Sequence, residues 1–506
     1  MSRTFRQAHY TEQRIPEYKG NPFIEALHPI RGSEQLLDAL KKYPEVPKDC
    51  TTWLTEERIQ GVWTALSLLQ PLSIHIEIAQ TVDSMLRLGL VPRNLPSKDA
   101  YFWQNVKETP EIIEESLEFL PSPMTTSTSI IGASGMGKTT AIGRILAQYP
   151  AVIEHPVSRV GDAGRIQLTW LYLNCTSTGS IGALCEHFFQ QVDKLFGMDS
   201  TSKESHYWKY ARGARKIDTL MGNVAHAASK YRLGVLVIDE LQFLSTAGVG
   251  MEKAMNYLTR LSNVAKVPIV YLGTYKVLPI LMKEFRQARR SAGQGDFLWH
   301  PMKKDGEWEH FIKVLWHYQY LEHKTELTTN LSETLYEESQ GITDYVVKLF
   351  LLAQVRAIVT GKEKLSSGLI KQVSKDSIRL VAPFLKKLKE KLKDPNSVEQ
   401  LAQVDDLDPL DFKEFFDRET STRVSLPVPG SDVPQPSQET PGQPSSAIEQ
   451  PTEASEASAT EKDISDADIT DLRKIWAQAK KEDRSCESVM LERGVIKPAT
   501  EFLHER

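Results

Sequence analysis

The stretch Thr128–Thr140 reads TSIIGASGMGKTT, and it decides how the rest of the chain is interpreted. A short apolar run, typical of a buried strand, leads into a glycine-rich loop that ends in a lysine and two threonines. The loop matches the pattern G-x-x-x-x-G-K-[ST] over Gly132–Thr139. In such a loop backbone N–H groups can turn toward a phosphate, and the following helix presents its positive end to the same anion. The stretch therefore predicts a phosphate-binding loop.

The loop residues are expected to hold a nucleoside triphosphate together with Mg²⁺. Lys138 is expected to bridge the β- and γ-phosphates, and Thr139 is expected to ligate the metal. A chance match in a surface loop is the alternative, and the strand pattern before the loop and the helix pattern after it argue against it. The predicted phosphate-binding residues are Gly132, Ala133, Ser134, Gly135, Met136, Gly137, Lys138, Thr139 and Thr140.

Two further apolar runs end in polar side chains that complete this site. The run LGVLVID ends at Asp239, which is expected to hold Mg²⁺, and Glu240 follows as the expected general base for an attacking water. The run VPIVYLGT ends at Thr274, whose hydroxyl is expected to orient that water because parallel strands end at the ligand crevice. A threonine that merely ends a strand remains the alternative reading of Thr274.

The segment EFRQARR at 284–290 places three arginines at a predicted helix end. A guanidinium is well suited to stabilise charge on a phosphoryl transition state. We expect Arg289 or Arg290 to act as an arginine finger in a neighbouring subunit's site, which would make hydrolysis depend on oligomerisation. A solvated basic helix end, favoured by the helix dipole, explains the same residues without a catalytic role.

The fold class follows from the alternation of apolar strand patterns with helical patterns, which indicates an α/β core with a largely parallel sheet. The segment at 396–462 is acidic and then rich in Pro, Ser and Glu, and it contains too few large apolar residues to bury a core, so we interpret it as a linker. An amphipathic element after such a linker favours partner binding. The predicted regions are a helical N-terminal region at 1–124, a nucleotide-binding core at 125–302, a helical lid at 303–395, an acidic then Pro/Ser/Glu-rich linker at 396–462, and a helical tail at 463–506.

Composition narrows the class of protein. The 506 residues are 41% hydrophobic and 25% charged, which is typical of a chain that buries a core. A net charge of −5 argues against nonspecific wrapping of nucleic acid, so any nucleic-acid surface must be local. Four separated cysteines and scattered histidines predict no cysteine or histidine metal site. Without a signal-peptide or membrane-span pattern, we expect a soluble intracellular protein.

Taken together, these motifs resemble the AAA+ ATPases of the TnsC/TniB family, which regulate target selection by multi-subunit cut-and-paste transposons. The phosphate loop is shared by many NTPases, whereas the N-terminal motifs and EFRQARR narrow the resemblance. The likeness spans about residues 20–360 and rests on NPFIEAL (21–27), LRLGLVPRN (86–94), GASGMGKTT, VIDELQ, YLGTYK and EFRQARR.

The resemblance implies an AAA+ P-loop core that uses ATP and Mg²⁺. It further implies a ring or helical filament on duplex DNA, with about six or seven subunits per turn, that controls DNA integration during transposition. The N-terminal region would contact a target selector of the TniQ/TnsD type, and the tail would contact transposase subunits of the TnsA/TnsB type. Such a protein would be cytoplasmic and associated with the bacterial nucleoid, without a membrane partner.

Candidate DNA contacts lie before and at the start of one predicted helix in the core. The expected residues are Arg159 and Arg165 together with the hydroxyls of Thr176, Ser177 and Thr178. Such groups contact phosphates and read the backbone rather than the sequence. An N-cap for the helix beside solvated arginines is an equally good explanation.

The lid departs from the family pattern at one position. Many AAA+ relatives carry a Sensor 2 arginine near the start of this helix, whereas this chain reads GITDYVVK, with Asp344 at the corresponding place. Lys348 could substitute, and otherwise the lid would sense nucleotide weakly. Slow hydrolysis, suited to a timer rather than a motor, is the expected consequence.

Two other functions stay open from the sequence. The chain could be an ATP-binding assembly scaffold that seldom hydrolyses ATP, or an initiator-like AAA+ ATPase such as a helicase loader. A transposase is disfavoured, because we can place no acidic triad and the best acidic pair, Asp239 and Glu240, already serves the phosphate site.

Overall fold

The fold is that of a computed structural model, which describes residues 5–94, 127–161, 165–175, 180–214, 216–245, 251–278, 281, 295–377 and 385. The chain divides into two compact units, Met1–Ser425 and Leu426–Arg506. The second unit lies outside the described residues, as do the predicted linker and tail, so everything below concerns the first unit.

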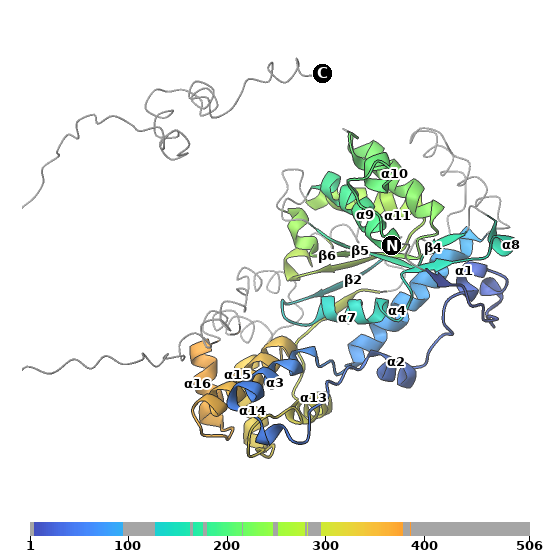
Figure 1. Cartoon of the computed structure of the whole chain (residues 1–506). Helices are drawn as coiled ribbons and strands as arrows, with labels where there is room; N and C mark the ends of the chain where they lie inside the picture. Colours follow the sequence, from blue (N-terminus) through green and yellow to red (C-terminus); the bar gives the residue numbers. More distant parts are fainter. Residues whose placement is uncertain are drawn as a thin grey trace, which may run out of the picture. The chain divides into compact units, whose positions relative to one another are not determined.

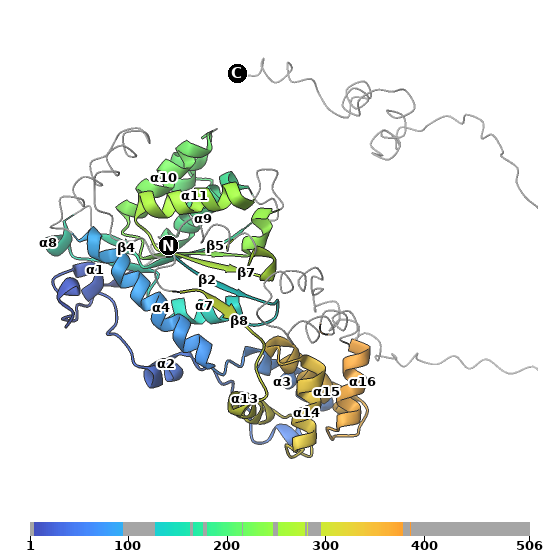
Figure 2. The ribbon, with the colours of Figure 1, turned by 180° about the vertical axis from the view of Figure 1, so that it is seen from behind.

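A five-stranded sheet of parallel strands forms the centre of this unit (Figures 1 and 2). β2, β6 and β7 are buried along their whole length, which matches their continuous apolar runs and is typical of a parallel sheet covered on both faces. The predicted α/β P-loop core is thereby confirmed. In sheet order the strands are β5 (Trp170–Asn174), β6 (Val235–Asp239), β7 (Ile269–Gly273), β2 (Ser127–Gly132) and β8 (Phe297–Trp299).

Helices cover both faces of this sheet (Figures 1 and 2). One layer holds α9 (Ile181–Phe196), α10 (Ile217–Lys230) and α11 (Met251–Ala265), and the other holds α4 (Ser73–Leu90) and α7 (Lys138–Leu146). α9 buries Phe188, Phe189 and Val192 along one side, as its helical spacing of apolar residues predicts. The nucleotide loop lies between β2 and α7.

The predicted strand IQLTWLYLN divides at Thr169. β4 (Ile166–Leu168) pairs antiparallel with β3 (Val152–Glu154), which in turn pairs with the N-terminal β1 (Arg6–Gln7) in a separate small sheet. The Thr169 N–H donates to the carbonyl of Ala151 over 2.9 Å, and β5 then enters the main sheet. The short α8 (Val157–Val160) follows β3.

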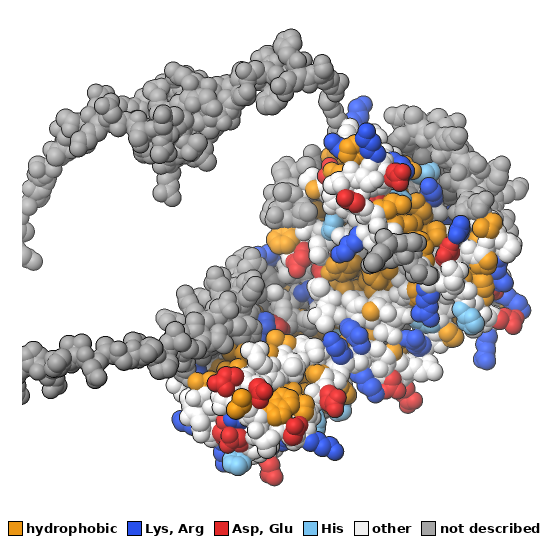
Figure 3. Space-filling model, in the orientation of Figure 1, with side chains coloured by type: hydrophobic (Ala, Val, Ile, Leu, Met, Phe, Trp, Pro, Cys, Tyr) orange, Lys and Arg blue, Asp and Glu red, His pale blue; other side chains and the backbone are white. Residues whose placement is uncertain are grey.

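A helical lid follows the sheet in sequence. α15 is buried on nearly every side, in keeping with its unbroken apolar sequence, and α14 and α16 pack against it. On the face drawn in Figure 3, acidic side chains gather over this part of the unit. The lid helices are α13 (Gly306–Trp316), α14 (Thr329–Ser339), α15 (Thr343–Val359) and α16 (Ser367–Ser377).

The described N-terminal helices are shared between core and lid rather than stacked as a separate layer. α1 (Pro22–Glu25), α2 (Ser33–Leu40) and α4 lie against the core, whereas α3 (Thr55–Thr64) packs on α15 of the lid. Arg58 of α3 donates to both carboxylate oxygens of Glu363, over 2.8 and 3.0 Å. Among the helices that the structure describes, none has the length and apolar character of a membrane span.

Candidate nucleotide-binding site

The phosphate loop joins β2 to α7 through two backbone positions that favour glycine. Gly135 and Gly137 have φ of +81° and +90°, a region that side chains with a Cβ seldom adopt. The first intrahelical bond of α7 runs from the Ala141 N–H to the Gly137 carbonyl over 2.8 Å. The N–H groups of the first turn precede this bond, so they and the helix dipole form a site for an anion.

Lys138 folds back over the loop from the first position of α7. Its ammonium donates to the carbonyls of Gly132 and Ala133 over 2.7 and 2.9 Å. Hydrogen bonds from an ammonium to an anionic oxygen are stronger than those to a neutral carbonyl. A bound phosphate would therefore offer Lys138 better acceptors at the place where its ammonium already lies.

The buried carboxylate of Asp239 connects the end of β6 to the loop. Thr139 Oγ1 donates to Asp239 Oδ2 over 2.7 Å, which brings together the two residues predicted to hold Mg²⁺. The hydroxyl of Tyr172 on β5 donates to the same oxygen. Burial, followed by this hydrogen bond, raises the pKa of Tyr172, so its hydroxyl stays protonated as a donor.

Tyr172 is a site residue that the sequence reasoning missed. The signal available was weak, because an aromatic residue in a strand is usually core. The position two residues before Asn174, which pairs with Asp239 in the β5–β6 register, could have shown that Tyr172 lies near the carboxyl end of the neighbouring strand.

Glu240 leaves the sheet in a left-handed backbone conformation. Its φ is +58°, its N–H donates to Asp239 Oδ1 over 2.7 Å, and its carbonyl accepts the Phe243 N–H over 3.0 Å. Gln242, in the 3-10 helix η7 (Leu241–Ser245), donates from Nε2 to the Glu240 carboxylate. The other amide atom of Gln242, Oε1, accepts the Thr274 N–H over 3.2 Å.

Thr274 follows β7 and faces the same edge of the sheet as Asp239. Its hydroxyl oxygen is buried and has no hydrogen-bond partner among the residues that the structure describes. A buried polar atom without a partner is uncommon and needs an explanation such as a water or a ligand. This observation suits the predicted role of Thr274 better than a plain strand end does.

The lid contacts the outer side of the loop through the start of α15. The Asp344 N–H donates to the Gly135 carbonyl over 3.1 Å, and the Asp344 carboxylate accepts from Lys348 Nζ over 2.7 Å. A Cβ at Gly135 would lie 3.3 Å from Ile342 Cγ2, so little space separates loop and lid. Lys348, the candidate substitute for a Sensor 2 arginine, is thus paired with Asp344.

The residues present fit a magnesium nucleotide. No group of three or more His, Cys, Asp or Glu side chains in the described part of the chain could enclose a metal ion by itself. Mg²⁺ commonly takes one or two protein ligands and completes its shell with waters and phosphate oxygens, and Thr139 with Asp239 match this use. Burial, followed by the charges of Asp239 and Glu240, raises the pKa of the neighbouring Cys175 to about 12, so its thiol stays protonated near neutral pH.

Several predicted residues fall outside this description or have partners elsewhere. Thr176, Ser177 and Thr178 lie outside the described residues, as do Arg289 and Arg290. The remaining two, Arg159 and Arg165, pair with Glu25 and Glu154, each over 2.5 Å. The DNA contacts and the arginine finger therefore stay predictions.

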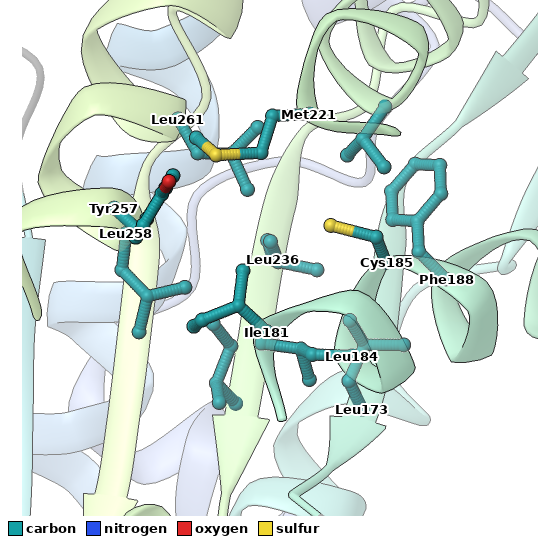
Figure 4. Close-up of a pocket in the computed structure, with 12 residues that line it drawn as sticks. Leu173, Ile181, Leu184, Cys185, Phe188, Met221, Leu236, Tyr257, Leu258 and Leu261 are labelled. Atoms are coloured by element: carbon teal, nitrogen blue, oxygen red, sulfur yellow. The ribbon is translucent and has the colours of Figure 1, made fainter. Parts of the chain in front are cut away.

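The core also contains an apolar cavity away from the phosphate loop. Figure 4 shows it between α9, α10, α11 and the sheet, with side chains such as Ile181, Cys185 and Leu236 at its wall. Its volume is about 20 Å³, roughly the room for one water, and its lining is almost entirely apolar. A triphosphate requires charged and polar partners, so this cavity is not the nucleotide site.

Residues 125–281 match the family model described as "AAA domain". Together with the parallel sheet and the phosphate loop, this match identifies the core as an AAA+ P-loop domain. A search of curated proteins found no matching sequence.

Three solved structures match the chain at low sequence identity. The Walker-type ATPase of Pyrococcus abyssi is 16% identical over 56% of this chain and 74% of its own, with a TM-score of 0.35. The ORC1 protein of Aeropyrum pernix, solved in complex with DNA, is 13% identical over 67% of this chain and 86% of its own, with a TM-score of 0.35. The Drosophila ORC bound to DNA is 13% identical over 69% and 80%, with a TM-score of 0.29. Likeness at this level does not define a function.

Proposed function

We propose that the AAA+ domain binds ATP with Mg²⁺ and hydrolyses it slowly. The observation that carries this proposal is the contact between Thr139 Oγ1 and Asp239 Oδ2, with Glu240 directly after it. It places the expected metal ligands and the expected base at one sheet edge beside the phosphate loop.

Each residue of the site has its own role in the proposed reaction. Lys138 and the N–H groups at the start of α7 bind the phosphate oxygens, and Thr139 and Asp239 hold Mg²⁺, which when bound offsets the charge of the phosphates. Glu240 accepts a proton from the attacking water, and Thr274 orients that water with its hydroxyl. Arg289 or Arg290 of a neighbouring subunit supplies positive charge for the transition state, which makes the reaction depend on assembly.

For the biological role we propose an ATP-dependent regulator of transposition that assembles on duplex DNA and links a target selector to transposase subunits. The support comes from the two N-terminal motifs that narrow the resemblance. They meet in space, because Asn21 Nδ2 donates to the Leu90 carbonyl over 3.0 Å. Two motifs far apart in sequence thus form one local structure on the core.

Exchanging Glu240 for Gln tests the enzymatic part. Removing a general base lowers turnover by roughly a hundred- to ten-thousand-fold, while ATP binding and ATP-dependent assembly on DNA should persist. Lys138→Ala is the matched control, because it should weaken both binding and assembly. Equal, negligible turnover of the wild type and the Glu240→Gln protein would favour the assembly scaffold instead.

The partner proposals need a separate experiment. The full chain and a chain that lacks residues 463–506 are compared in pull-downs with transposase subunits and with a replicative helicase. Loss of transposase binding on removal of the tail would support the proposed role, whereas helicase binding would favour the loader alternative. Imaging with duplex DNA and a non-hydrolysable ATP analogue should show rings or filaments. A protein that stayed monomeric and did not bind DNA in any nucleotide state would contradict the proposed role as a regulator.

A further inference from the structure

The Gln242 side chain makes hydrogen bonds to both Glu240 and Thr274. Its donor atom Nε2 serves the carboxylate of the expected base, and its acceptor atom Oε1 serves the backbone of the residue expected to orient the water. A primary amide is the side-chain group that offers a donor and an acceptor at one end. The geometry therefore joins two parts of the site that come from different strands.

We propose that Gln242 is a positioning residue, which holds the Glu240 carboxylate at a fixed place relative to Thr274. The proposal rests on the function proposed above and deepens it. In this arrangement Gln242 acts through the Glu240 carboxylate, to which it donates a hydrogen bond.

The backbone shows why Glu240 needs such support. A non-glycine residue in the left-handed region is disfavoured and persists where its surroundings over-determine it. Glu240 is held there through its N–H by Asp239, through its carbonyl by Phe243, and through its carboxylate by Gln242. The first two contacts act on the backbone, whereas the hydrogen bond from Gln242 acts on the side chain.

The test uses the full chain in its assembled form on DNA. In Gln242→Glu, the acceptor for the Thr274 N–H remains and the donor to Glu240 becomes a carboxyl group. Because two neighbouring carboxylates repel each other, Glu240 should leave its place, and kcat should fall by roughly tenfold or more while KM for ATP stays within about twofold of wild type. Gln242→Met, of similar size, should lower kcat by roughly ten- to a hundred-fold through the lost hydrogen bond.

A charge swap supplies a readout that needs no turnover. In the nucleotide-free protein, the double exchange Glu240→Gln with Gln242→Glu rebuilds the hydrogen bond with donor and acceptor reversed. It should recover the thermal stability lost in Gln242→Glu and remain inactive. Gln80→Glu, which adds the same charge on the exposed face of α4, is the matched control and should leave kcat and thermal stability unchanged.

The outcomes separate the two levels. If the wild type turns over ATP and the Gln242 variants keep the same kcat and the same thermal stability, this inference alone is overturned. A wild type without turnover would overturn the inference together with the proposed function.

Discussion

The polar edge of the sheet and the junction of α3 with the lid use the same kinds of hydrogen bond for different ends. At the sheet edge, Lys138 bonds to neutral carbonyls and the Thr274 hydroxyl has no partner among the described residues, so a ligand can improve on the present contacts. At the junction, the Arg58 side chain is 3% exposed and already bonds to both oxygens of Glu363. The sheet edge can therefore exchange its present hydrogen bonds for those of a ligand, whereas the ion pair at the junction keeps α3 attached to the lid.

The largest expected change in stability tests the junction of α3 with the lid. Arg58→Met removes one member of a buried ion pair and leaves the Glu363 carboxylate without it, so the free energy of unfolding should fall by about 3–5 kcal/mol. Urea unfolding at neutral pH measures this loss. The double exchange with Glu363→Gln should recover part of it, whereas a loss within experimental error for Arg58→Met would show that the junction does not fasten α3.

The free energy of unfolding is also expected to depend on pH, by up to about 3 kcal/mol, through His75 near the start of α4. His75 Nδ1 accepts the Leu72 N–H over 3.0 Å, and burial lowers its pKa from 6.5 to about 4. Because the unfolded state binds the proton first, this stabilisation is present above pH 6.5 and is lost as the pH falls toward 4.

The exchange His75→Gln isolates that effect. Glutamine at this position can still accept the N–H of Leu72 but does not titrate. Unfolding free energies measured between pH 4 and 7 should therefore fall less steeply in the variant. Parallel curves for the two proteins would show that His75 does not carry the effect.

At the sheet edge, substitutions are expected to change ligand affinity rather than stability. Lys138→Ala removes a charge-assisted hydrogen bond worth about 1.5–3 kcal/mol, so ATP affinity should fall by roughly ten- to a hundred-fold. Calorimetric titration measures it. Lys348→Ala is the comparison, because Lys348 is paired with Asp344 and should cost less. Equal losses would mean that the lid lysine also binds phosphate.

The smallest effect lies where loop and lid meet. Gly135→Ala places a Cβ at φ +81° and 3.3 Å from Ile342, and it should destabilise the protein by about 1–2 kcal/mol. Gly143→Ala in α7 is the control, because nothing lies within 4 Å of its Cβ and alanine favours a helix. It should stabilise the protein in thermal unfolding, and a stable Gly135→Ala would contradict the tight fit.

The sequence predicted the sheet and the residues at its carboxyl edge because both follow from local patterns. The apolar runs before Gly132, Glu240 and Thr274 predict parallel strands, and parallel strands bring their ends to one edge. The contact of Thr139 with Asp239 agrees with that expectation.

Long-range contacts could not be predicted in this way. No local pattern shows that Tyr172 donates to Asp239, that Gln242 bridges Glu240 to Thr274, or that α3 pairs with the lid. These contacts depend on which elements the fold brings together across large sequence distances, and the Arg58–Glu363 pair alone spans 305 positions.

The path of the N-terminal chain limits how far the lid can travel. Residues before Lys42 are held on the core by Arg144, which donates to the carbonyls of Leu40 and Lys41, and α4 returns to the core after residue 72. Any swing of the lid must carry α3 with it and draw on the slack in the two short stretches that flank α3. The two stretches that flank α3 therefore tie the position of the lid to that of the N-terminal segment on the core.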